Sequence, residues 1–220
     1  MTLDLIIPIW KPVDWTSFDV VKNIRNQIKP SKVGHAGSLD PFAEGVLMLC
    51  TGSKTKSIEA FMDQEKEYHA EIELGSETDT YDLTGKVVLT SHIPELNTKS
   101  INKILKYYTG QIMQEPPMYS ALKYKGRPLY KLARQGITVQ RRKRLINIYD
   151  IQLQEFSVNS IIITVICGRG TYIRSLAHDI SQSLGTVGHL KRLKRTRIGD
   201  IDKQACIKVK EFPSWLSARA

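Results

Sequence analysis

The stretch that most constrains this chain is GHAGSLDPFAEGVL, residues 34–47, which leads directly into the apolar run Val46–Cys50. Its glycines permit backbone angles that a side chain would forbid, so the segment can turn tightly. Pro41 fixes its own φ and pushes Asp40 toward an extended conformation. The pattern predicts a stiff loop that presents the Asp40 carboxylate beside a buried strand. An aspartate that only hydrogen-bonds its own turn would show the same pattern, so the loop alone does not establish an active site.

The chain has 220 residues, of which 41% are hydrophobic, enough for one large domain or a domain with a small appendage. No apolar run approaches the roughly 18 residues of a membrane span, and the N-terminus lacks a signal pattern. Cys50, Cys167 and Cys206 are odd in number and lie mostly in apolar runs, which predicts reduced thiols in a cytoplasmic protein. The five histidines show no zinc-ligand spacing with these cysteines, so we expect no metal.

The formal net charge of +10 is distributed unevenly along the chain. Residues 1–110 hold 12 basic and 15 acidic side chains, whereas residues 111–220 hold 20 basic and 7 acidic ones. A basic half on an otherwise nearly neutral protein is typical of a protein that binds a polyanion. The alternative is a basic surface with no partner.

Hydrophobic periodicity indicates a mixture of strands and helices without a strict βαβ alternation. We expect strands at Leu3–Ile9, up to Cys50, at Lys66–Leu74, Lys86–Thr90, Gln111–Gln114, Arg141–Gln154 and Ser160–Cys167, and helices at Thr16–Ile28, Thr55–Met62, Asn97–Thr109 and Thr171–Leu184. Residues 188–199 are expected to be the last ordered piece. The predicted fold class is α+β, with a central mixed, mostly antiparallel sheet and flanking helices.

Three further stretches carry side chains suited to chemistry. They are Lys66–Tyr68, the segment RGTYIRSL at residues 169–176, and the basic run LKRLKRTR at residues 190–197. Each also has a structural explanation. Tyr68 would suit a core strand, Arg174 a surface helix charge, and the basic run a solvated edge strand.

Taken together, these stretches resemble the bacterial TruB family of tRNA pseudouridine synthases, which modify the T-loop uridine (U55) of tRNA. The resemblance covers nearly the whole chain. It rests on KPVDWTSFDVV, GHAGSLDPFAEGVL, KEYHAEIELG with the following TDTYDLTG, PPMYSALKYKGRPLYKLARQG, GRGTYIRSLAHDI and LKRTRIG. It implies the pseudouridine synthase fold, with a catalytic domain over residues 1–200 and a flexible basic thumb inserted at about 118–144.

The resemblance also implies the roles of individual residues. Asp40 corresponds to the catalytic carboxylate that helps detach uracil from C1′ and rejoin it through C5. Whether such an aspartate attacks the sugar, adds to the base or removes a sugar proton stays open. Arg174 resembles its ion-pair partner, which would keep Asp40 ionised in an apolar cleft. Tyr68 resembles the residue that stacks on the flipped base and assists proton removal from C5.

The remaining implied contacts are with RNA. Tyr172 and Leu193 resemble walls of the uridine pocket, and His35 matches a residue that contacts RNA near the vacated base position. The expected RNA-binding side chains are Lys123 and Lys131 in the thumb and Lys194 and Arg195 in the last basic run. The implied partner is the T-arm of tRNA, with no cofactor because the reaction is a redox-neutral isomerisation. We expect a monomer without an obligate protein partner.

Two features depart from the family pattern. Family members commonly continue into a C-terminal RNA-binding PUA domain, whereas residues 201–220 are expected to form only a short tail. Glu44 stands where the family usually has a small or hydroxyl residue, and we expect it to face a basic neighbour such as Lys32 or Lys54. The alternative functions are a non-catalytic tRNA-binding or tRNA-folding protein of the same fold and an enzyme that modifies another RNA.

Overall fold

The computed structural model describes residues 3–29 and 32–219, which form two compact units. Unit 1 comprises residues 1–69 and 193–220, and unit 2 comprises residues 70–192. Strands β4 (Lys66–Leu74) and β12 (Gly188–Ile198) each begin in one unit and end in the other. The family resemblance implies a single catalytic domain over residues 1–200.

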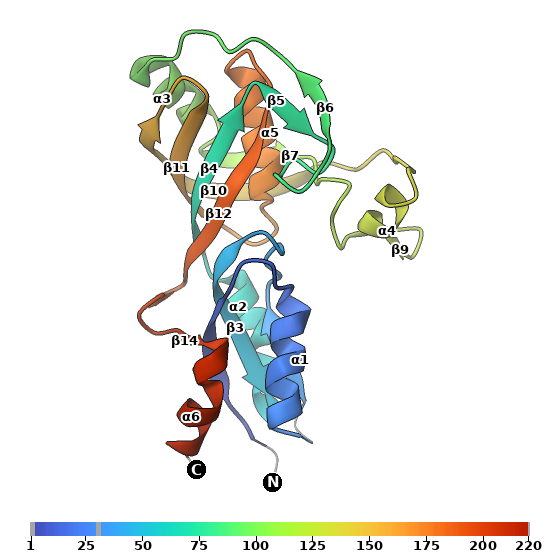
Figure 1. Ribbon diagram of the computed structural model, residues 1–220, viewed down its shortest axis with the longest axis vertical. Helices are drawn as coiled ribbons and strands as arrows, with labels where there is room; N and C mark the ends of the chain where they lie inside the picture. The colour runs from blue at the N-terminus through green and yellow to red at the C-terminus, as the bar shows by residue number, and fades with distance from the viewer. Residues whose placement is uncertain (1–2, 30–31, 220) are drawn as a thin grey trace. The chain divides into compact units, whose positions relative to one another are not determined.

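Unit 1 is a mixed sheet with helices on its faces (Figure 1). Its elements are β1 (Ile6–Lys11), α1 (Ser17–Gln27), β2 (Val33–Ala36), β3 (Glu44–Thr51), η1 (Gly52–Ser57), α2 (Ile58–Asp63), β13 (Ile201–Asp202), β14 (Ile207–Lys208), η2 (Val209–Glu211) and α6 (Phe212–Ser217), with parts of β4 and β12. The strand order is β14-β1-β3-β12, with β2 paired to β3 and β13 paired to β12. The pairs β1–β14 and β3–β12 are parallel, and β1–β3 and β2–β3 are antiparallel.

Strand β3 is buried on both faces, which explains the uninterrupted apolar run that follows the Asp40 loop. Leu47 and Leu49 pack into a core with α1, β1 and Phe212 of α6. Val46 and Met48 point to the opposite face, where Phe61 and Met62 of α2 cover them. Successive side chains of a strand alternate between faces, so a strand covered on both sides needs apolar residues at every position.

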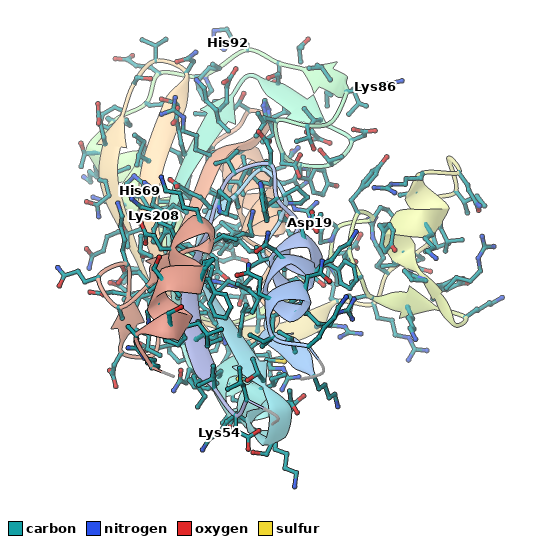
Figure 2. All side chains as sticks on the ribbon, turned by 60° about the horizontal axis from the view of Figure 1, so that its bottom comes forward. Asp19, Lys54, His69, Lys86, His92 and Lys208 are labelled. Atoms are coloured by element: carbon teal, nitrogen blue, oxygen red, sulfur yellow. The ribbon has the colours of Figure 1, made fainter. Side chains whose placement is uncertain are left out.

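Helix α1 forms where the sequence predicts it. Thr16 is the N-cap and forms a capping box with Asp19, which lies at the start of the helix in Figure 2. Val20, Val21 and Ile24 are the buried face, at the spacing of a helix whose apolar side meets a sheet.

Residues 201–219 are an integral part of unit 1. Strand β14 pairs with β1, at Ile9 with Ile207 and Trp10 with Lys208. Phe212 at the start of α6 is fully buried in the same core as α1. The ordered structure therefore continues past residue 199, because these late residues complete one edge of the sheet and one face of its core.

Unit 2 is a sheet in the order β12-β4-β11-β10-β7, joined by two small hairpins. Its elements are β5 (Ser76–Thr78), β6 (Val87–Thr90), α3 (Thr98–Tyr107), β7 (Gly110–Gln114), β8 (Lys123–Tyr124), β9 (Arg127–Pro128), α4 (Leu129–Ala133), β10 (Arg144–Phe156), β11 (Ser160–Cys167) and α5 (Ile173–Ser183). Strands β10 and β11 form the predicted long hairpin, and β7 pairs antiparallel with β10. The alternating burial of β11 shows that one face of this sheet lies in the core.

The predicted mixed, mostly antiparallel fold is confirmed, and most predicted elements lie within a few residues of the observed ones. Strands β2, β5, β13 and β14 were not predicted, since they are too short to show a period. Residues 188–199 were expected only to be ordered, and most of them form β12. Among the described residues, no helix has the length and apolar character needed to cross a membrane.

Gly45 gives a test of the β3–β12 contact. Its φ is +131°, and a Cβ atom there would lie 2.2 Å from the carbonyl oxygen of Arg195. We expect Gly45→Ala to lower the free energy of unfolding by at least about 3 kcal/mol, because both the backbone conformation and the strand spacing forbid a side chain. The measurement is urea unfolding. Gly126→Ala is the control, with a φ of +80° and nothing within 4 Å of the added atom. Equal losses for the two variants would contradict the steric argument.

Candidate active site

The backbone of the Asp40 loop (residues 37–43) is held by the buried guanidinium of Arg195. This side chain, only 1% exposed, enters from β12. Nε donates to the Val46 carbonyl at 2.7 Å, and the two Nη atoms donate to the carbonyls of Ser38 at 3.3 Å and Gly37 at 3.2 Å. A charged donor placed among backbone carbonyls fixes the course of a loop strongly. The family resemblance implies an RNA contact for Arg195, whereas its burial and these partners favour a role in positioning the loop.

Lys11 holds the same loop through Pro41 and was missed in the sequence analysis. The side chain is fully buried, and Nζ donates to the carbonyls of Pro12 at 2.8 Å, Trp15 at 2.5 Å and Pro41 at 3.2 Å. Burial lowers the pKa of Lys11 to about 8, the Asp40 carboxylate acts to raise this pKa, and the Arg195 charge acts to lower it. Lys11 is therefore protonated at neutral pH, and its three hydrogens match the three carbonyl acceptors.

The residues on either side of Asp40 are anchored to the segment that leads into α1. The amide of Leu39 donates to Oγ of Ser17 at 2.9 Å, and the amide of Asp14 donates to the Pro41 carbonyl at 2.8 Å. Asp14 has a φ of +66°, the left-handed conformation that aspartate tolerates better than most residues. The half-buried Asp40 therefore lies between two residues whose backbone is held by hydrogen bonds, which defines the position of its own Cα atom.

Glu44 has a basic partner, but not the predicted one. Its carboxylate lies 3.1 Å from Nζ of Lys194 and accepts a hydrogen bond from Nε1 of Trp10 at 3.0 Å. Burial acts to raise the pKa of Glu44, but the hydrogen bonds from Lys194 and Trp10 outweigh it, and the net pKa is lowered. The expectation that Glu44 faces a basic neighbour is confirmed, but that neighbour is Lys194 and not Lys32 or Lys54, because the parallel β3–β12 pair places Lys194 directly opposite Glu44.

The other predicted residues of unit 1 lie on its strands. Tyr68 on β4 and Leu193 on β12 are buried. Lys194 is paired with Glu44, and its side chain is still 42% exposed, so it remains open to solvent. His35 lies on β2, where burial lowers the pKa of the imidazole and the charge of Arg195 lowers it further. A neutral imidazole at neutral pH follows.

In unit 2, Arg174 lies on the first turn of α5 with its guanidinium buried. It is 4% exposed, and it donates to the carbonyls of Thr80 at 3.0 Å and Tyr119 at 2.8 Å. Its Nη1 also lies 3.5 Å from the buried carboxylate of Asp82. That carboxylate in turn accepts hydrogen bonds from the hydroxyl of Thr80 and from the amide and hydroxyl of Thr84. Arg174 is therefore fixed in direction, as a buried charge requires.

Asp82 and Gln114 are site residues that the sequence analysis did not single out. Asp82 stands in the quoted TDTYDLTG motif, so the motif itself was the available signal. Gln114 is buried at the end of β7, and its amide bonds both the backbone N–H of Tyr172 at 2.8 Å and its carbonyl at 3.0 Å. This pair of bonds fixes the residue that caps α5, two positions before Arg174.

The thumb (residues 118–144) is a small hairpin and helix with its own apolar centre, drawn at α4 and β9 in Figure 1. Met118, Leu129 and Leu132 are buried together, whereas Lys123 and Lys131 are exposed. Burial raises the pKa of Tyr119 at the base of the thumb, and the nearby Asp79 carboxylate raises it further. The Tyr119 carbonyl also accepts a hydrogen bond from the guanidinium of Arg174, so the base of the thumb contacts a predicted site residue directly.

The predicted site residues therefore fall into two groups. Unit 1 holds His35, Asp40, Tyr68, Leu193, Lys194 and Arg195, and unit 2 holds Lys123, Lys131, Tyr172 and Arg174. Each group includes one buried arginine whose guanidinium is held by backbone carbonyls. Within the described part of the chain, no cluster of three or more histidine, cysteine, aspartate or glutamate side chains suits a metal ion.

Comparison with known families defines the class of protein. The model of the TruB family pseudouridylate synthase N-terminal domain matches residues 25–173, and that of the tRNA pseudouridylate synthase B C-terminal domain matches residues 174–219. The chain belongs to the TruB family of pseudouridylate synthases, as the sequence motifs predicted.

Individual relatives agree with this assignment. The chain is 46% identical over 200 residues to tRNA pseudouridine synthase B of Francisella tularensis subsp. tularensis (strain WY96-3418), covering 90% of this chain and 66% of the relative. It is 42% identical over 212 residues to tRNA pseudouridine synthase B of Phocaeicola vulgatus, covering 94% of this chain and 90% of that one. The chain thus spans just under two thirds of the Francisella protein's length.

Solved structures of two complexes share the fold. A chain of the Cbf5-Nop10-Gar1 complex superposes with a TM-score of 0.74 at 28% identity, covering 98% of this chain and 56% of that one. A chain of an H/ACA RNP bound to a substrate RNA containing 2'-deoxyuridine gives 0.71 at 25% identity, covering 98% and 55%. The fold is therefore that of the pseudouridine synthases.

The pKa of Lys11 gives a test of its place beneath the Asp40 loop. Its folded pKa of about 8 lies below the ordinary value of 10.5, so between these pH values the unfolded chain holds a proton that the folded chain has released. Stability due to this group therefore rises with pH across that window. We expect the difference in unfolding free energy between wild type and Lys11→Met to widen from about pH 8 to 10 and to stay constant below about pH 7.5.

Urea unfolding at a series of pH values measures this difference. Lys86→Met is the control, since Lys86 is exposed on unit 2 (Figure 2). A constant difference over the whole range would show that Lys11 is not held as the structure describes.

Proposed function

We propose that this chain is a tRNA pseudouridine synthase that isomerises the T-loop uridine (U55) of tRNA. The observation that carries the proposal is the Asp40 loop, whose backbone is fixed from beneath by Arg195 and Lys11. A carboxylate on a fixed backbone suits a reaction that needs one group held at one reacting atom of the nucleotide. Family membership and the names of the relatives support the same activity.

The proposed reaction conserves all atoms. The bond between C1′ and N1 of the uridine breaks, a bond between C1′ and C5 forms, C5 loses its proton and N1 gains one. No oxidant, reductant or cofactor is needed for this balance. The uridine in a folded T-loop hides its glycosidic bond, so the base has to leave the stack before the reaction begins.

In this proposal each site residue has a defined role. Asp40 is the catalytic carboxylate, and Arg174 is its ion-pair partner, which keeps the carboxylate ionised when the base excludes water. Tyr68 stacks on the flipped uracil and assists removal of the C5 proton. Tyr172 and Leu193 line the pocket for the base, and His35 contacts the RNA at the vacated position. A neutral His35 suits stacking against a base.

The proposed RNA footprint includes the exposed lysines Lys123 and Lys131 of the thumb, together with Lys194. The basic excess of residues 111–220 supports this assignment. The T-arm of tRNA is the proposed partner, the cytoplasm the proposed compartment and a monomer the proposed state.

Conversion of tRNA by an Asp40 variant tests the activity. The substrate is an in vitro transcribed tRNA in single-turnover reactions, with pseudouridine located by chemical mapping. We expect wild type to convert one T-loop uridine and Asp40→Asn to react at least about a thousandfold more slowly, with unchanged tRNA binding, because the amide keeps the shape but loses the charge. Asp200→Asn, at an exposed aspartate of the same unit, is the control.

Tight binding without conversion by the wild type would support a tRNA-folding protein instead. Pseudouridine at another position would support an enzyme with a different RNA substrate.

Salt dependence tests the RNA footprint. Phosphate contacts release counterions, so tRNA affinity should fall steeply with added salt, with a slope in log–log form of roughly 0.7 to 0.9 per contact. We expect Lys123→Ala and Lys131→Ala each to reduce that slope by about one contact. Lys86→Ala, which removes an exposed lysine outside the thumb, should leave the slope unchanged. A flat salt response of the wild type would contradict the footprint.

A further inference from the structure

One face of α5 contacts strand β5 and the loop that follows it. Arg174, His178 and Gln182 follow one another at intervals of four residues, so their side chains lie along the same side of the helix. All three contact either strand β5 or residues 78–85, which we call the Asp82 loop. Arg174 belongs to the site already described. The other two side chains have no role in the proposed reaction.

His178 is packed between two residues of this region. Its ring stacks on the ring of Tyr81, with centroids 4.2 Å apart and planes inclined by 21°. Its Nδ1 lies 3.3 Å from a carboxylate oxygen of Glu77, and the same oxygen accepts a hydrogen bond from Gln182 at 3.4 Å. Burial raises the pKa of the Tyr81 hydroxyl, and the Glu77 carboxylate raises it further, so Tyr81 stacks as a neutral ring at neutral pH.

Tyr81 needs such support because its backbone is in an unfavourable conformation. Its φ is +60°, in the left-handed region that bulky side chains rarely adopt. Such a conformation persists only where the surroundings enforce it. The Tyr81 amide donates to the Thr78 carbonyl at 3.1 Å, and its carbonyl accepts from the Leu190 amide at 3.0 Å. The stacked His178 ring is the side-chain part of this support.

The residues on either side of Tyr81 are the partners of Arg174. The Thr80 carbonyl accepts from its guanidinium, and the Asp82 carboxylate forms its ion pair. The direction of both groups depends on the turn that the chain makes at Tyr81. A change at Tyr81 would therefore move two of the groups that orient the buried guanidinium.

We propose that His178, assisted by Glu77, is a positioning residue for the Arg174–Asp82 pair. Its ring keeps Tyr81 in the left-handed conformation, and Tyr81 in turn keeps Thr80 and Asp82 directed at Arg174. This role rests on the proposed function, because its catalytic effect is read through Arg174. The flat aromatic ring of His178 is the essential feature, because stacking on Tyr81 is the contact through which His178 acts on the conformation of the Asp82 loop.

Two substitutions separate the ring from its polar atoms. His178→Ala removes the stack, whereas His178→Phe keeps an aromatic face and loses the contact with Glu77. We expect His178→Ala to lower the single-turnover rate constant for pseudouridine formation about tenfold, with a tRNA Kd within about twofold of wild type. His178→Phe should recover the rate to within about threefold. The control is His92→Ala, at an exposed histidine in the loop after β6 (Figure 2).

A wild-type rate in His178→Ala would overturn the proposal. So would a His178→Phe variant as slow as His178→Ala, because the stack would then not matter. If His178→Ala fails to fold, His178→Leu takes its place, since leucine fills the space without an aromatic face.

A double-mutant cycle tests the route of the effect. If His178 acts through Asp82, adding His178→Ala to Asp82→Asn should cause less than a further twofold loss of rate, because the pair is already broken. Full additivity of the two losses would show that His178 acts by another route and would overturn the proposal.

Amide hydrogen exchange separates a failure of this proposal from a failure of the proposed function. Exchange in residues 76–86 requires no activity, so it can be measured even if the wild type forms no pseudouridine. We expect exchange in this segment to be faster in His178→Ala than in wild type and to return toward wild type in His178→Phe. Unchanged exchange in His178→Ala would overturn the positioning role, whatever the enzyme assay shows.

Discussion

The structure of unit 1 depends on buried cations that bind backbone carbonyls. Arg195 and Lys11 each donate three hydrogen bonds to backbone carbonyls in or beside the Asp40 loop. A buried charge is tolerated only when its hydrogens are satisfied, so the loop and the two cations stabilise one another. The loop is rigid because its carbonyls solvate these charges.

Unit 2 uses the same principle with one addition. Arg174 also binds carbonyls, but its charge is balanced by Asp82, which has its own donors in Thr80 and Thr84. In both units, charge-assisted hydrogen bonds to the backbone fix a residue of the proposed site. In unit 1 they hold the loop that carries Asp40, and in unit 2 they hold Arg174 itself. Side chains that never touch substrate thus set the direction of those that do, which is how a site gains accuracy from its supporting residues.

Much of this could be predicted from the sequence, and the limits are physical. The period of α1, the apolar run of β3 and the alternation of β4 define their elements, because each pattern reports burial directly. The partners of Glu44, Arg195 and Asp82 could not be predicted, since they depend on strand register and on loop conformation. The motif that contains Asp82 was visible, but its pairing with Arg174 joins residues 92 positions apart.

The division of the chain has a consequence for the order in which it folds. Unit 2 is continuous, whereas unit 1 needs both its first strand and Phe212 of α6 to complete one core. During synthesis, residues 70–192 all leave the ribosome before β14, the partner of β1, emerges from it. The early strand must wait through that interval with an unsatisfied edge, and such edges pair with other chains. The half of the protein made first is therefore the half finished last, and it is the more exposed to aggregation during translation.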